Sequence, residues 1–144
     1  MTLRAASRLI ATLSLGLVPC LGASAAEIAV VVSATTSVSS LTEDQLADIY
    51  LGRSNRFPNG TPAVPCDLAE DSPLRETFYA RVIGKTPAQI KAHWSKMIFT
   101  GRGEPPREVA SSAAAKTLVV ARPGVVCYID KALVDLSVTV LFSR

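Results

Sequence analysis

The sequence contains little of the chemistry on which most enzymes depend. It has one histidine, His93, and no GxSxG elbow, so a Ser–His–Asp hydrolase would have a single base available. No group of Cys and His has the spacing of metal ligands, and no P-loop or glycine-rich dinucleotide fingerprint is present. We therefore expect a protein that is not an enzyme and has no cofactor or metal, and we interpret His93 as a surface or packing residue.

Basic residues are also scarcer in the folded part of the chain than the formal net charge of +3 suggests. Arg4 and Arg8 precede a mostly apolar run at 9–21, and small residues at 23–25 follow it. This order is typical of a secretory signal with its cleavage site. We expect residues 1–25 to be a signal peptide that is removed, which places the protein in the periplasm or outside the cell.

The remaining residues, 26–144, have the size of one domain. The predicted signal holds two of the fifteen basic residues and none of the twelve acidic ones, so the net charge falls to +1 (15 − 2 − 12). No stripe of Lys and Arg remains, which argues against nucleic acid as a partner. The apolar run of the signal is shorter than the roughly 20 residues that span a bilayer, so we do not interpret it as a membrane-spanning helix. We expect no membrane insertion once the signal has been removed.

Two cysteines, Cys66 and Cys127, follow the predicted signal. Each lies in a short apolar run that predicts a strand, PAVPCDL and GVVCYI. Export leads to compartments in which disulfides persist, and a bond requires the two strands to be neighbours with facing Cβ atoms. The alternative is a pair of buried free thiols. We favour the disulfide between Cys66 and Cys127.

The order of predicted elements indicates an α/β or mixed α+β layer structure. Three helix starts are marked by capping signals: Thr42 with a glutamine three residues later, Ser72 with proline at the first helical position, and Thr86 with both. Short β-branched runs predict strands. We expect strands at 27–33, 62–68, 125–129 and 137–142, helices at 42–52, 72–84, 86–98 and 108–121, and a loop at 99–107.

The segment DSPLRETF, residues 71–78, contains the most specific candidate site. A helix start presents free backbone N–H groups and the positive end of the helix dipole, which favour an anion. Ser72 adds a hydroxyl, and Arg75 adds a forked donor that suits phosphate or carboxylate. The alternative is a well-capped helix in which Arg75 pairs with Glu70 or Asp71, and the local sequence leaves the two readings open.

A second candidate lies in the hydroxyl-rich loop at 33–40. Thr35, Thr36 and Ser37 follow a predicted strand, and the loops after parallel strands are the usual ligand position in open α/β sheets. Such residues are also ordinary turn material. We predict Thr35 and Thr36 as a second wall of the anion site.

Four segments taken in order resemble a known family: LTEDQLADIYLGRSNRFPNG, AVPCDLAEDSPLRETFYARVIG, HWSKMIFTGRGEPPREV and RPGVVCYID. They are similar to small single-domain phosphate ABC transporter substrate-binding proteins, relatives of the periplasmic phosphate-binding superfamily. The resemblance implies one lobe of a type 2 periplasmic-binding-protein fold, an α/β structure with a mixed sheet flanked by helices. It also implies binding of phosphate or a similar small oxyanion for an ABC transporter.

The sequence departs from the pattern of the larger family at the expected oxyanion turn. Cys66 and Asp67 stand near the position of a strand-end arginine, and Pro73 follows Ser72 where that family has glycine. Proline removes one backbone N–H, and nearby carboxylates oppose a dianion. We therefore expect a second body to complete the site, either a homodimer or an ABC transporter permease or other envelope protein.

Cys127 is another departure, because the family has glycine before the tyrosine of this motif. Both departures introduce a cysteine, which strengthens the predicted disulfide with Cys66. An alternative function is a half-lobe interaction module of the cell envelope that no longer binds solute and docks through the FPNG and FTGRGEPP loops.

Overall fold

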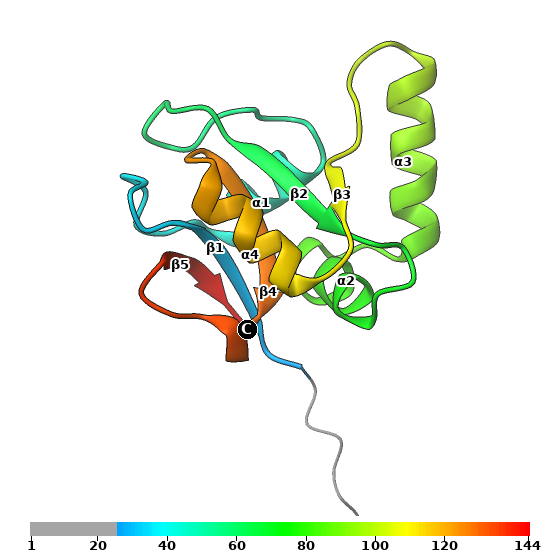
Figure 1. Ribbon diagram of the computed structural model, residues 1–144. Coiled ribbons are helices and arrows are strands. Elements are labelled where there is room, and N and C mark those ends of the chain that lie inside the picture. The colour runs from blue at the N-terminus through cyan, green and yellow to red at the C-terminus, as the bar shows by residue number, and fades with distance from the viewer. Residues whose placement is uncertain (1–25) are drawn as a thin grey trace, which may run out of the picture.

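The computed structural model describes residues 26–144, which form a five-stranded sheet with helices around it (Figure 1). The predicted signal peptide lies outside these described residues. In chain order, the structure contains β1 (Ile28–Ser33), α1 (Glu43–Tyr50), β2 (Val64–Leu68), α2 (Pro73–Phe78), a π-helical segment (Tyr79–Ile83), α3 (Pro87–Phe99), β3 (Arg107–Val109), α4 (Ser112–Ala121), β4 (Val125–Asp130), a 3-10 turn (Lys131–Leu133) and β5 (Val138–Ser143).

The sheet is mixed, with the strand order β3-β2-β4-β1-β5. β2 runs parallel to both β3 and β4, whereas β1 runs antiparallel to β4 and β5. The last residue of β1 therefore lies beside the first residues of β2 and β4, at the opposite end of the strands from the last residues of β2 and β4. The predicted α/β class with a mixed sheet is confirmed, and the strand directions determine which loops can share a site.

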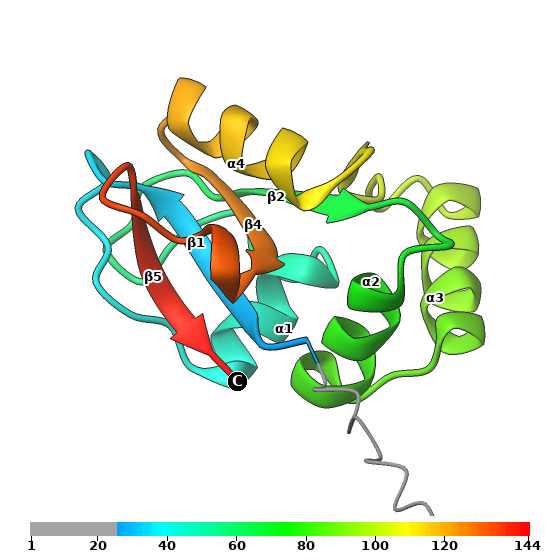
Figure 2. The ribbon, with the colours of Figure 1, turned by 60° about the horizontal axis from the view of Figure 1, so that its bottom comes forward.

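Helices cover both faces of the sheet. Figure 2 shows α4 on one face and α1 with α2 on the other, while α3 lies beyond the edge formed by β3. Because both faces are covered, every residue of β1 is buried, as are the first five residues of β4. This explains why both strands are runs of β-branched and apolar residues without alternation. Among the described residues, no helix has the length and apolar character needed to span a bilayer.

The three predicted helix starts are present in the structure. Thr42 and Thr86 each form a complete capping box with the glutamine three residues later, which satisfies two backbone donors at each start. Ser72 caps α2 through its hydroxyl, which accepts a hydrogen bond from the Arg75 backbone N–H at 3.4 Å. The helical segment ends at Gly84, whose φ of 73° is left-handed and favours glycine.

The prediction of a helix at 108–121 is wrong about where the helix begins. Residues 107–109 form β3, an edge strand parallel to β2, and the helix begins only at Ser112. Ser111 is the cap, and its hydroxyl accepts from the Ala114 backbone N–H at 3.1 Å. Pairing with β2 outweighs the local preference for helix. As a result Glu108 lies directly beside Asp67 of β2, which matters for the charge of the site.

Candidate functional site

A buried carboxylate, that of Asp67, lies near the end of β2 and is 5% exposed. Its Oδ1 accepts hydrogen bonds from the Leu68 N–H at 2.9 Å and from the Tyr128 hydroxyl. Its Oδ2 accepts from Arg75 Nε at 3.1 Å and from the Tyr79 hydroxyl at 2.8 Å. Four donors occupy the two oxygens, so the carboxylate acts as a fixed anchor and has no acceptor left for a ligand.

The tyrosines around this anchor are held in the protonated form. Burial raises the pKa of both Tyr79 and Tyr128 above the ordinary value, and the charge and hydrogen bond of Asp67 raise it further. Burial also raises the pKa of Tyr50, whose hydroxyl donates to the carbonyl oxygens of Cys66 at 3.1 Å and Val126 at 3.2 Å. Three buried hydroxyls therefore depend on remaining protonated in the folded state.

Alkaline pH is expected to destabilise the protein through Tyr50, Tyr79 and Tyr128. Since their folded-state pKa values lie above 10.0, the unfolded chain loses these protons first as pH rises. The free energy of unfolding should be constant with respect to these groups below about pH 10 and fall above it by about 1.4 kcal/mol per pH unit for each tyrosine. Urea denaturation at a series of pH values measures this slope. Tyr79→Phe should reduce the slope by about a third, and an unchanged slope in that variant would contradict the assignment.

Arg75 is the cation that Asp67 anchors. Its side chain is 13% exposed, and its guanidinium carbon lies 5.1 Å from the centre of the Tyr79 ring, a distance typical of a cation–π contact. Burial alone would lower the pKa of Arg75, but the charge and hydrogen bond of Asp67 raise it above the ordinary value. Only Nε is used in the ion pair. Within residues 26–144 the two terminal nitrogens of Arg75 have no hydrogen-bond acceptor.

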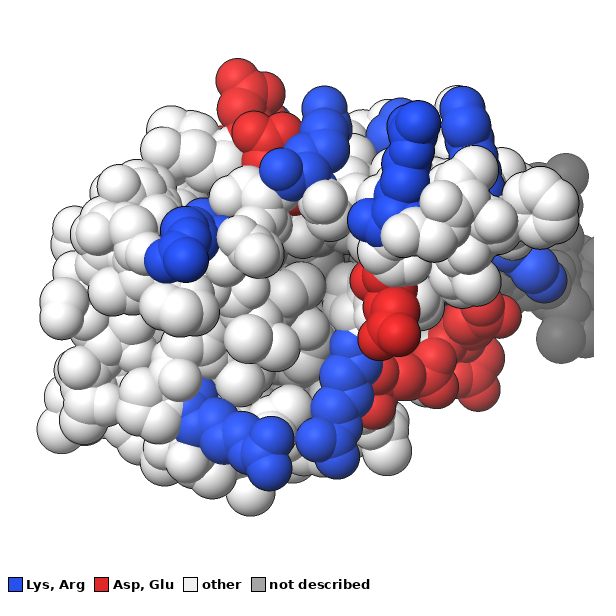
Figure 3. Space-filling view, turned by 90° about the horizontal axis from the view of Figure 1, so that it is seen from above, with Lys and Arg blue, Asp and Glu red and all other residues white. Residues whose placement is uncertain are grey.

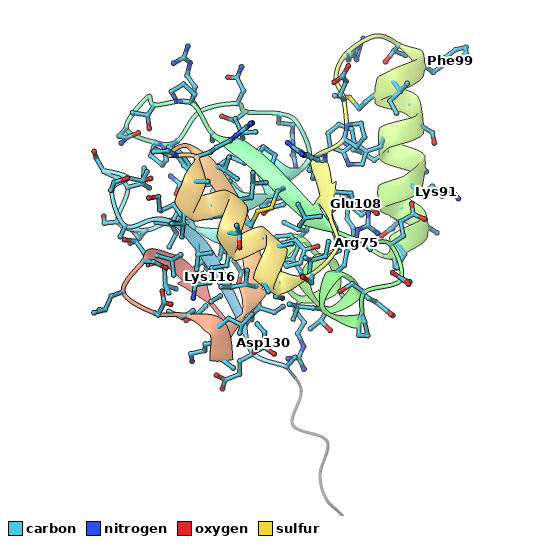
Figure 4. The ribbon with its side chains drawn as sticks, in the orientation of Figure 1. Arg75, Lys91, Phe99, Glu108, Lys116 and Asp130 are labelled. Carbon is cyan, nitrogen blue, oxygen red and sulfur yellow. A yellow bond between two sulfur atoms is a disulfide. The ribbon has the colours of Figure 1, made fainter. Side chains whose placement is uncertain are left out.

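An open cleft of about 470 Å³ lies beside Arg75. It is bordered by β2, β3, α2, α3 and the loop that precedes β3, and Figure 4 shows Arg75, Lys91 and Glu108 close together on α2, α3 and β3. The charged residues that line the cleft are Asp67, Glu70, Arg75, Lys91 and Glu108. Two cations and three carboxylates therefore face one cleft, and only the Asp67 carboxylate is fully occupied by donors.

The structure divides the four predicted ligand residues between two places. Arg75 lines the cleft, whereas the Ser72 hydroxyl caps α2 and does not. Thr35 and Thr36 follow β1 and line a separate cavity of about 290 Å³ at the other end of the strands, where β2 and β4 begin. They do not form a second wall with Ser72 and Arg75, because β1 runs antiparallel to β4, which is itself parallel to β2.

Arg75 also has a different acidic partner from the two that the sequence suggested. Glu70 and Asp71 are near in sequence, but both are exposed, and the ion pair is made with the buried Asp67. Asp67, near the end of β2, is buried and lies within reach of Arg75 on α2. Arg75 therefore pairs with Asp67, although Glu70 and Asp71 are closer to it in sequence. Sequence reasoning missed the pairing because nothing local shows which carboxylate is buried.

Lys91 and Glu108 are two charged lining residues that the sequence did not indicate. Lys91 and Trp94 lie on α3, which is brought to the cleft by its position beside β3 (Figure 1). The regular apolar spacing along this helix is typical of a buried stripe that includes Trp94, but it does not show that Lys91 borders a charged site. Glu108 was expected in a helix, so its place next to Asp67 could not be foreseen.

His93 has a structural contact rather than a place in this cleft. Its Nε2 lies 2.8 Å from the carbonyl oxygen of Leu51, the residue that ends α1, and its ring meets Trp94 edge-to-face at 5.0 Å. No group of three or more His, Cys, Asp or Glu in the described part of the chain could hold a metal.

The surface charge is mixed on the face seen from above. Figure 3 shows one group of acidic side chains to the right of the centre of this face and another at its top, with Lys and Arg side chains between and beside them. On this face the basic residues form no continuous stripe.

The two cysteines are joined by a disulfide in the structure. Cys66 lies on β2 and Cys127 on β4, with their Cα atoms 5.1 Å apart, and β2 and β4 are parallel neighbours. Asp67 and Tyr128 are the next residues of the two strands. The disulfide therefore links the strands directly beside the hydrogen bond between the Tyr128 hydroxyl and the Asp67 carboxylate.

The described residues have a periplasmic-binding-protein-like α/β fold, of the kind found in phosphate-binding proteins of ABC transporters. A proposed phosphate ABC transporter substrate-binding protein from Clostridium perfringens, solved with bound phosphate, is similar with a TM-score of 0.63 and 22% identity over 81% of this chain and 45% of that one. An ABC-type phosphate transport receptor from Vibrio cholerae gives 0.62 and 23% over 81% and 46%. PstS from Borrelia burgdorferi gives 0.58 and 15% over 81% and 47%.

The chain spans somewhat less than half the length of these structures, as expected for a single lobe. At these identities the likeness shows the fold alone. No protein-family model matches the chain, and no curated protein matches it.

Proposed function

We propose that the protein is an exported solute-binding-like protein that binds a small oxyanion, phosphate or a similar group, at the cleft beside Arg75, and that it acts with an ABC transporter permease or another envelope partner. One observation carries the proposal: Arg75 is anchored through Nε while its two terminal nitrogens have no acceptor among the described residues. A guanidinium edge in this state is a preorganised donor for an oxyanion.

The surroundings of Arg75 support this function. The side chain is 13% exposed, so an anion that reaches it competes with little water, and hydrogen bonds to charged groups contribute about 1.5–3 kcal/mol each. Lys91 supplies a second cation from α3. Of the four ligand residues predicted from the sequence, the proposal keeps Arg75 as the direct contact and adds Lys91.

A partner is proposed because one lobe supplies few donors. The cleft is open, and Glu70 and Glu108 border it together with Asp67, so the affinity of the isolated lobe for anions should be modest. A homodimer or an envelope protein would supply the remaining donors. Export is supported by the disulfide together with the predicted signal at 1–25, because disulfides persist in oxidising compartments.

Calorimetric titration with phosphate and sulfate tests the site through two lysines of the same helix. Lys91 lines the cleft, whereas Lys96 does not, and both are exposed. Lys91→Ala should weaken anion binding by about threefold to tenfold, as expected for a partly screened charge, and Lys96→Ala should leave it unchanged. Arg75→Ala should weaken it by more than about tenfold.

The folded state of each variant is checked by circular dichroism, because Arg75→Ala also leaves a buried carboxylate without its cation. Anion binding that survives unchanged in both Lys91→Ala and Arg75→Ala would place the site elsewhere. Complete absence of binding to these anions, together with recovery of a stable envelope partner, would favour the interaction module over solute capture.

A further inference from the structure

We infer that the cleft beside Arg75 prefers an organic monoanion, a carboxylate carried on an apolar or aromatic body, over free inorganic phosphate. This inference rests on the proposed anion site and names the class of ligand that the site selects.

The size of the cleft is the first reason. Its volume of about 470 Å³ lies in the range of roughly 300–1,000 Å³ that is usual for pockets that hold organic ligands. A phosphate ion bound at Arg75 would leave most of this space to water. A ligand with a body of several carbon atoms would fill it while its charged end stays at the guanidinium.

The apolar walls are the second reason. Ile90, Trp94 and Ile98 are four residues apart along α3 and therefore lie on one side of the helix. All three line the cleft, and Pro105 and Pro106 line it from the loop before β3. Ile98 is 56% exposed. A ligand body that covers this exposed apolar surface removes it from water, which favours binding.

The balance of charges selects a monoanion. The cleft is lined by the three carboxylates of Asp67, Glu70 and Glu108 against the two cations Arg75 and Lys91. Each further negative charge on the ligand meets this excess at short range. Inorganic phosphate is a mixture of monoanion and dianion near neutral pH and mainly the dianion at higher pH, whereas a carboxylate carries one charge and still offers two oxygens to the guanidinium edge.

The test is a calorimetric comparison of 3-phenylpropionate, acetate and inorganic phosphate on the purified protein. We expect 3-phenylpropionate to bind at least about tenfold more tightly than either small anion. Ile98→Ser should weaken 3-phenylpropionate binding by about threefold to tenfold, because it removes an apolar wall, and should leave acetate unchanged. Phe99→Ser is the matched control, since Phe99 is 92% exposed and points away from the cleft at the end of α3 (Figure 4).

The outcomes separate this inference from the proposed function. Phosphate binding as tight as that of 3-phenylpropionate, and weakened by Lys91→Ala, would keep the anion site and overturn the preference for an organic ligand. Absence of binding for all three anions would overturn both. Binding of 3-phenylpropionate that is indifferent to Ile98→Ser and to Lys91→Ala would place that ligand outside the cleft and also overturn the inference.

Discussion

Asp67→Ala is expected to lower the free energy of unfolding by about 3–5 kcal/mol, as observed when one partner of a buried ion pair is removed. The variant leaves the guanidinium of Arg75, which is 13% exposed, without its counter-charge. It also leaves the hydroxyls of Tyr79 and Tyr128 without the acceptor that they share. Each unsatisfied buried group adds a penalty of about 1–3 kcal/mol before relaxation.

Urea denaturation followed by circular dichroism measures the effect of Asp67→Ala. Asp71→Ala is the matched control, because Asp71 is exposed and its replacement should change stability by less than about 0.5 kcal/mol. Asp67→Asn tests the role of charge at constant shape. It should also destabilise the protein, since an amide brings two N–H donors into a group of donors. A loss below about 1 kcal/mol in Asp67→Ala would contradict the anchoring role.

The double variant Cys66→Ala/Cys127→Ala is expected to be less stable than the parent by about 2–5 kcal/mol. The two cysteines are 61 residues apart in sequence, so the bond excludes many extended conformations of the unfolded chain, and the chain-entropy model gives about 4 kcal/mol for a loop of this length. Both side chains are buried, so loss of the sulfur atoms adds a packing penalty.

Denaturation curves with and without reductant separate the bond from the packing. Reductant should move the midpoint of the parent protein to lower urea concentration and should not move that of the double variant. Non-reducing mass spectrometry, in which each free thiol adds about one hydrogen mass, gives the redox state directly. A parent midpoint that is unaffected by reductant under conditions that reduce the unfolded chain would contradict a stabilising disulfide.

Much of the fold could be predicted from the sequence because its local signals agree with the tertiary structure. Thr42, Ser72 and Thr86 begin helices in the structure as their capping patterns indicated. The apolar runs that contain Cys66 and Cys127 are strands of the sheet. Such signals depend on neighbouring residues alone, so one sequence is enough to find them.

The errors occur where distant segments decide the local structure. The alanine-rich stretch at 108–121 favours helix throughout, yet its first two residues pair with β2, which the sequence around Glu108 does not show. The direction of β1 relative to β2 cannot be inferred locally either. For this reason Thr35 and Thr36 lie at the opposite end of the strands from Arg75 and line a different cavity.

The candidate site, like the fold, could be predicted from the sequence only in part. Arg75 could be predicted from the cap and the cation that share one turn, but its partner Asp67 and its neighbour Lys91 could not. Asp67 lies on β2 and Lys91 lies on α3, and their proximity to Arg75 depends on how these elements pack. The sequence therefore predicts a cationic turn, and the structure is needed to see that its outer edge faces a cleft.

Asp67 holds Arg75 through Nε, and we propose that Arg75 offers its terminal nitrogens to an anion in the cleft. Heteronuclear NMR of arginine side chains during titration with 3-phenylpropionate or phosphate examines both contacts at once. We expect the terminal nitrogen signals of Arg75 and the backbone amide signals around Lys91 to shift while the Arg75 Nε signal stays nearly unchanged. Shifts confined to the loop of Thr35 and Thr36, or no shift at Arg75 under saturating anion, would contradict it.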